Sequence, residues 1–207
     1  TGTLNSADGN TGVGIGVFAA LTTGDNNVAV GLNALTTNTT GSSNIAIGLC
    51  SLRLNSTGAG NTSLGTNSLR CNTTADDNVA IGRSSLRDTT TGATNTAVGT
   101  SALNANTTAD NNVAIGDSAL KTNTTGTRNT GIGTCALNAN TTASNNVAVG
   151  FCALDTNQTG TANVAVGSNA LGVNTASNNT AVGREALGAN TSGCFNTALG
   201  ASTLLVN

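Results

Sequence analysis

Apolar and polar positions recur along this chain with a period of 17 residues. The mark of each copy is a glycine that follows Asn, a β-branched residue, a small residue and an aliphatic residue. It falls at Gly14, Gly31, Gly48, Gly65, Gly82, Gly99, Gly116, Gly133, Gly150, Gly167, Gly183 and Gly200. Only the interval from 167 to 183 is shorter, at 16 residues. Because twelve copies fill residues 10–207, the repeat decides the fold.

Copies within the chain can be compared position by position, with the repeat glycine as position 0. Position −4 is Asn in all twelve copies, position −1 is Val, Ile or Leu, and position +4 is Leu in eleven. Position +3 is Ala or Ser in ten copies, position +7 is Asn in ten, and position +9 is Thr in nine consecutive copies. Positions +1, +2, +5 and +6 vary, so they do not define the unit.

The repeat predicts an all-β chain. A unit of 17 residues is too short for a helical hairpin, and its Thr, Asn, Val, Ile and Gly content disfavours helix. Positions −4 to −1 and +1 to +5 are predicted as two short strands, joined by an Asn- and Thr-rich turn. We therefore expect a parallel β-solenoid (β-roll) of about twelve coils over residues 10–207, with residues 1–9 as a lead-in or subunit-contact segment. The one-residue deletion, between Leu171 and Asn179, is expected to lie in a turn.

Stacking of identical positions about 4.8 Å apart accounts for the constant residues. Leu at +4 and the aliphatic residue at −1 are expected to form the apolar core, and Gly at 0 marks a corner with positive φ or close backbone approach. Asn at −4 is expected to form a structural ladder, because buried amides must be paired. The ladder comprises Asn10, Asn27, Asn44, Asn61, Asn78, Asn95, Asn112, Asn129, Asn146, Asn163, Asn179 and Asn196.

Both faces of the strand at −4 to −1 are restricted, one to aliphatic residues and the other to Ala and Asn. A surface strand would tolerate variety on its outer face. Either one face contacts another chain, or the coil is so flat that both faces are constrained. We favour self-association, as a homo-oligomer or a head-to-tail filament.

Composition excludes several classes of function. Charged residues are 8% of the chain, the net charge is −2, there is no His, and the only aromatic residues are three Phe. The chain therefore lacks the commonest general base, and its scattered Lys and Arg residues do not suit nucleic acid. The longest apolar run, residues 12–21, is about half of a membrane span, so no membrane insertion is expected. The first residues contain neither a start Met nor a signal peptide, which indicates a mature chain or a section of a longer one.

No motif in the sequence predicts an enzyme, a cofactor or a metal site. The G-x-G-x-x-A match that begins at Gly14 lacks a βαβ unit, and the S-x-x-K match of Ser118 and Lys121 lacks its companion motifs. Asp25, Asp76 and Asp110 share position +11, but a calcium-binding solenoid would carry acids in nearly every copy. We interpret these acids as turn residues.

Cysteines and sequons are candidates for covalent modification. Cys135 and Cys152 occupy position +2 of adjacent copies, where their Cα atoms are expected about 5 Å apart, within disulfide range. Asn-x-Ser/Thr sequons recur at +7, and either the Asn- and Thr-rich turn creates them automatically or they carry N-glycans that supply solubility. The candidate glycosylation sites are Asn38, Asn55, Asn72, Asn106, Asn123, Asn140, Asn157 and Asn190.

The unit Asn-Val-Ala-Ile-Gly-Asp-Ser-Ala-Leu, residues 112–120, resembles the repeats in YadA-like heads of trimeric autotransporter adhesins. It is similar also to the Asn-Thr-Ala-Val-Gly-x-x-Ala-Leu arrays of tail-fibre and related surface-fibre proteins. The resemblance covers all twelve copies. It implies a left-handed parallel β-roll, often trimeric, at the distal end of a surface fibre that contacts a host or matrix.

The two ends of the chain suggest assembly, because solenoids need polar caps to remain soluble. Apolar residues are instead concentrated in the first and last copies, and the candidate end-to-end interface comprises Ile15, Phe18, Leu21, Leu204, Leu205 and Val206. We expect a non-enzymatic extracellular structural protein, the subunit of a self-associating fibre or filament at a cell or virion surface. The alternative is an adhesin or receptor-binding fibre head that binds a host or matrix ligand. A minor alternative is an ice-binding solenoid, suggested by the Thr columns at +8 and +9.

Overall fold

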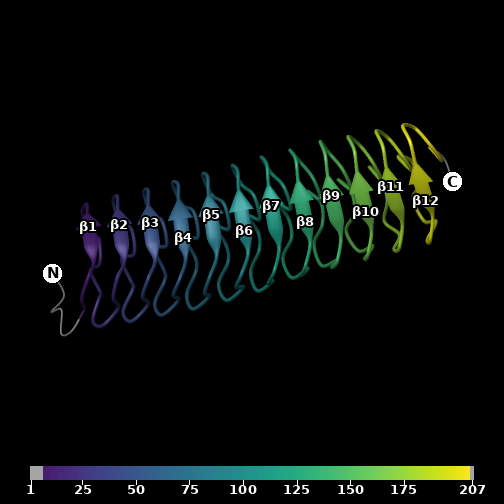
Figure 1. Cartoon of the computed structure of the whole chain (residues 1–207). Coiled ribbons are helices and arrows are strands. Elements are labelled where there is room, and N and C mark those ends of the chain that lie inside the picture. Colours follow the sequence, from purple (N-terminus) through teal and green to yellow (C-terminus); the bar gives the residue numbers. More distant parts are fainter. Residues whose placement is uncertain (1–6, 206–207) are drawn as a thin grey trace.

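The computed structural model describes residues 7–205, which form a parallel β-solenoid. Each coil contributes one three-residue strand at positions −3 to −1. The strands are β1 (Thr11–Val13), β2 (Val28–Val30), β3 (Ile45–Ile47), β4 (Thr62–Leu64), β5 (Val79–Ile81), β6 (Thr96–Val98), β7 (Val113–Ile115), β8 (Thr130–Ile132), β9 (Val147–Val149), β10 (Val164–Val166), β11 (Thr180–Val182) and β12 (Thr197–Leu199). They pair in parallel and in chain order as one sheet that runs along a rod (Figure 1).

The second strand expected at positions +1 to +5 does not form. After the repeat glycine the backbone returns to positive φ at every second residue, as at Gly116 (135°), Ser118 (57°) and Leu120 (50°). Strands require negative φ, so this segment is a corner rather than a strand. The sequence could not reveal it, because Leu has no preference for the left-handed region that it occupies here in eleven coils.

The core is narrower than the sequence suggested. Ala114 at −2, Ala119 at +3 and Leu120 at +4 are fully buried, and the same positions are buried in the interior coils. The aliphatic residue at −1 was expected in the core, but it faces outward, and Ile115 is 40% exposed. Alternation along the strand explains the correction: Asn at −4 and Ala at −2 point inward, so positions −3 and −1 must point outward.

The repeat glycine is required by close approach between coils. At Gly116 φ is 135°, and an added Cβ would lie 2.6 Å from the carbonyl carbon and oxygen of Gly133 in the next coil. The shortened interval leaves this stacking intact, because β10 and β11 pair in register, with Ala165 opposite Ala181. The deletion lies in the turn between these strands, as predicted.

Candidate interaction surfaces

The described part of the chain, residues 7–205, contains no pocket and no cluster of three or more His, Cys, Asp or Glu residues placed to hold a metal ion. Within the same range, no helix is long and apolar enough to span a bilayer. Candidate functional features must therefore be sought in the side-chain columns along the rod and at its two ends.

The Asn column at position −4 forms a hydrogen-bonded ladder inside the rod. In its middle, Asn112 is fully buried, and its Nδ2 donates to Asn95 Oδ1 at 3.2 Å and to the Gly126 carbonyl at 2.9 Å. The backbone N–H of Asn129 donates to Asn112 Oδ1 at 2.9 Å. Each amide therefore ties its own coil to the coils on both sides. At the ends of the rod, Asn10 and Asn196 are only partly buried.

A second amide ladder, at position +7, contradicts the N-glycosylation hypothesis. Asn140 Nδ2 donates to Asn123 Oδ1 at 2.7 Å, and Asn123 Nδ2 donates to the Gly126 carbonyl at 2.9 Å. An N-glycan is attached through this same nitrogen, so it requires an accessible side chain. All eight candidate residues are fully buried: Asn38, Asn55, Asn72, Asn106, Asn123, Asn140, Asn157 and Asn190. The signal for a ladder was the constancy of Asn at +7, which was read as a sequon.

The predicted disulfide is not formed. Cys135 and Cys152 stack at position +2 of adjacent coils, yet all five cysteines are free. Burial raises the pKa of the Cys152 thiol, with further contributions from the charge of Asp155 and from Cys135. Burial also raises the pKa of Asp155, and a hydrogen bond with Asn138 acts in the opposite direction. Cys152 is therefore a weak nucleophile, because less of it is thiolate at any given pH.

This difference predicts the order of cysteine alkylation. Below its raised pKa, Cys152 remains a thiol, so at pH 8 it should react with iodoacetamide several-fold more slowly than Cys194, which is exposed in a turn. The rates can be measured by mass spectrometry of peptides at timed intervals. Unfolding in guanidinium should bring the two rates together. Equal rates in the folded protein would contradict this account of Cys152.

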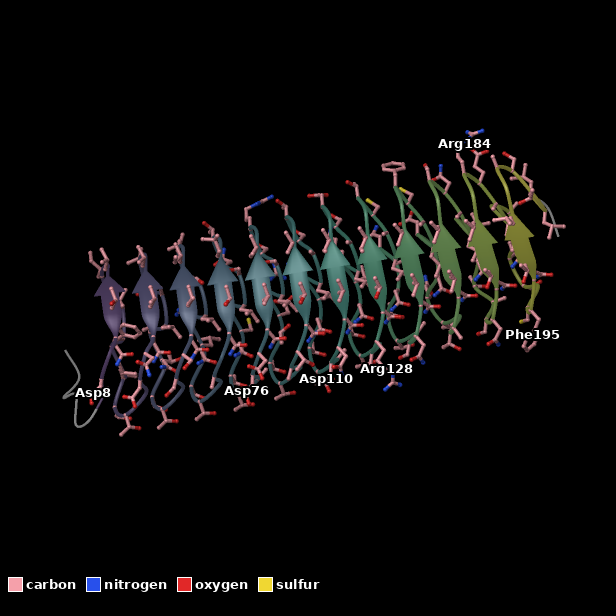
Figure 2. The ribbon with its side chains drawn as sticks, in the orientation of Figure 1. Asp8, Asp76, Asp110, Arg128, Arg184 and Phe195 are labelled. Atoms are coloured by element: carbon pink, nitrogen blue, oxygen red, sulfur yellow. The ribbon has the colours of Figure 1, made fainter. Side chains whose placement is uncertain are left out.

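The turn edge of the rod uses its acids to satisfy backbone groups. Asp76 and Asp110 each accept a hydrogen bond from the backbone N–H one coil earlier, of Ala59 and Ala93 respectively, both at 2.7 Å. Figure 2 shows both acids along one edge of the rod, with Arg184 at the opposite edge. Ser144 accepts in the same way from Thr127, at 3.0 Å. These contacts give the turn residues a structural role.

The turn contacts also reveal a two-coil repeat that the 17-residue reading missed. From Gly58 to Gly193, position +10 alternates strictly between Gly and Ala. The accepting side chain at +11 belongs to the Ala-bearing coil, as in the Ala75–Asp76 and Ala109–Asp110 pairs. Over this stretch, neighbouring coils are therefore complementary rather than identical.

The Thr columns form a narrow array. At +8 the hydroxyl is used within the rod, as where Thr124 Oγ1 donates to the Thr141 carbonyl at 3.0 Å. At +9 the threonines from Thr23 to Thr159 are exposed, so the solvent-facing hydroxyls form one column. Ice binding remains a prediction.

The outward face of the sheet carries two columns without charge. Position −1 is aliphatic in every strand, and position −3 is Val, Ile or Thr. These side chains are partly or largely exposed from β2 to β11. The face that was expected to contact another chain is thus the aliphatic one, and it points away from the rod.

The candidate end-to-end residues separate into different environments. Ile15 is 80% exposed, and Leu204 and Leu205 are also exposed. Phe18 is partly buried against the core, and Leu21 is fully buried, so Leu21 is not available for a contact between subunits. Val206 lies outside the described residues. The exposed members belong to the coils that contain β1 and β12, each of which has only one neighbouring strand in the sheet.

Together these features define the chain as a parallel β-solenoid repeat protein. No family model, curated protein sequence or solved structure matches it. The resemblance to YadA-like and tail-fibre repeats therefore remains a prediction from the sequence, as do the trimer and the host contact that it implies.

Proposed function

We propose that this chain is a non-enzymatic structural protein, a rod-shaped subunit of an extracellular fibre that assembles by self-association. The observation that carries the proposal is the exposure of apolar side chains where the stack of coils ends. Ile15 projects beside β1, and Leu199 and Leu204 are 78% and 50% exposed in the coil of β12. Exposed apolar patches mark association surfaces, and solenoids ordinarily cover such ends with polar residues.

The use of polar side chains supports a structural role. The amides at −4 and +7, many hydroxyls at +8, and acids at +11 are hydrogen-bonded to neighbouring coils, as at Asn112, Asn123, Thr124 and Asp110. These groups stabilise the stack instead of converging on a common point. The surface location is proposed from the resemblance to surface-fibre repeats.

A second candidate is an adhesin or receptor-binding fibre head. It is favoured by the variable position +1, where Leu32, Leu49 and Phe151 are exposed. Such side chains could form a ligand-binding edge. Imaging of the native surface distinguishes the two candidates, because long filaments support the structural subunit and short projections support the fibre head.

Self-association can be tested by sedimentation velocity of the purified chain over a hundredfold range of concentration. We expect species larger than the 20.0 kDa single chain, and their fraction should increase with concentration. Moderate salt should have little effect, because the exposed residues at the ends are largely uncharged. Single chains at every concentration would overturn the proposal.

A further inference from the structure

We propose that β12 of one copy pairs with β1 of a second copy, in the parallel register of the interior strands, so that the solenoid continues across the joint. This inference rests on the proposed function and specifies the contact by which the subunits assemble. The partner is a second copy of this chain. The proposal is carried by the hydrogen-bonding groups, the side chains and the partial coils at the two ends.

Interior coils are joined by a fixed set of backbone hydrogen bonds. The N–H at −3 donates to the carbonyl at −4 of the next coil, as from Val113 to Asn129 at 2.8 Å. The N–H of the repeat glycine donates to the carbonyl at −1 of the preceding coil, as from Gly133 to Ile115 at 2.7 Å. The N–H at +4 donates to the carbonyl at +3 of the next coil. Each coil therefore presents different groups to its two neighbours.

At the β12 end, the groups that would face a further coil have no such partner among the described residues. They are the N–H groups of Thr197 and Leu204 and the carbonyl of Leu199. Unpaired strand edges are templates for pairing with another chain.

The β1 end presents the complementary set. The carbonyls of Asn10 and Val17 and the N–H of Gly14 make none of these bonds with the residues that the structure describes. In the interior register, Asn10 of the second copy accepts from Thr197, and Gly14 donates to Leu199. Every donor thus meets an acceptor, whereas two β12 ends placed together would not match in this way.

The partial coils at the two ends are also complementary. Asp8 has the bonds of position +11: its N–H donates to Asp25 Oδ1 at 2.8 Å, and its carbonyl accepts from the Asn26 N–H at 2.9 Å. Gly9 has the positive φ of position +12, at 67°. Residues 7–9 therefore form the end of a turn that precedes β1, and residues 196–205 form a strand and corner. Across the joint, these two parts belong to the same coil.

Side-chain burial favours the same arrangement. Leu204 occupies position +4, where leucines of the interior coils are fully buried, but it is 50% exposed because no coil covers it. At the other end, Val17 and Phe18 are only partly buried against the core. Stacking of the two ends would extend the Leu column and remove this apolar surface from water.

The repeat glycine provides a test that separates the joint from the fold. An added Cβ at Gly183 would lie 2.4 Å from the carbonyl oxygen of Gly200, whereas at Gly200 its nearest neighbour is the side-chain Cγ2 of Thr203, at 3.2 Å. Gly200→Ala therefore meets no backbone within its own chain. In the joint, however, it would meet the carbonyl of Gly14 of the second copy.

We expect Gly200→Ala to sediment as single chains at concentrations where the wild type assembles, with a circular dichroism spectrum unchanged from that of the wild-type single chain. Its β1 end remains intact, so a tenth of an equivalent added to wild type should cap growing assemblies and shorten them. Ser202→Ala is the matched control, because its hydroxyl contacts Glu185 in the preceding coil, away from the joint. It should assemble like the wild type.

Thr197→Pro is a second variant in case Gly200→Ala fails to fold. It removes an N–H that makes no hydrogen bond within the described chain, at an edge strand where proline is tolerated. Loss of one hydrogen bond per joint should raise the concentration needed for assembly about fivefold. If the wild type assembles and both variants assemble equally well, the joint is wrong but the proposed function stands. If the wild type does not assemble, the proposed function itself fails.

Discussion

Replacement of Gly116 with alanine is expected to destroy the solenoid around β7. The new Cβ would lie 2.6 Å from the backbone of Gly133, which cannot move without breaking the pairing of the next coil. Alanine would also be strained at the φ of 135°. A clash with backbone on both sides of a fixed register should cost about 5 kcal/mol or more of the free energy of unfolding. Chemical denaturation followed by circular dichroism measures this loss.

Two controls assign that loss to the contact between coils. Gly172→Ala places a Cβ no closer than 3.2 Å to its nearest neighbour, so it should be tolerated. Gly200→Ala shares the positive φ, at 115°, but has no coil beyond it and should cost much less than Gly116→Ala. A small and equal effect of all three substitutions would contradict the tight stacking of the coils.

The second large effect is expected from Asn112→Ala, which interrupts the ladder at position −4. The substitution removes the acceptor for the Asn129 N–H and the donor to Asn95 Oδ1 and the Gly126 carbonyl. Because the site is fully buried, the groups left behind cannot bond to water. We expect a loss of about 3–5 kcal/mol, measured by guanidinium unfolding.

Asn104→Ala is the matched control for the ladder variant. Asn104 lies at position +5 and is only partly buried, and its Nδ2 makes one hydrogen bond, to the Ser84 carbonyl at 2.8 Å. Its loss should cost about 1 kcal/mol. If the two Asn variants proved equally stable, the buried amide ladder would not be a main source of stability.

The sequence predicted the solenoid because a strict period forces equivalent positions to stack. It therefore indicated the all-β fold, the approximate number of coils and the turn that absorbs the deletion between residues 171 and 179. It did not predict which strand face is buried, since Ala at −2 and Ile at −1 are both apolar. That choice depends on the narrow interior, which accommodates Ala114 but leaves Ile115 outside.

The corner and the turns were harder to predict, for a different reason. Leucines such as Leu120 adopt positive φ because burial in the column outweighs their local preference, and tertiary packing of this kind leaves no mark in local propensity. The sequons at Asn123 and its equivalents misled because the same Asn and Thr residues serve a buried ladder and an exposed turn. Only the coordinates separate the two uses.

The central claim, that the chain is a rod-shaped subunit that assembles end to end, is tested most directly by cryo-electron microscopy of the purified 207-residue protein at assembling concentration. The account predicts thin filaments in which strands remain about 4.8 Å apart without interruption, including between β12 of one copy and β1 of the next. Rods that never exceed the length of one chain, or that associate only side by side, would contradict it.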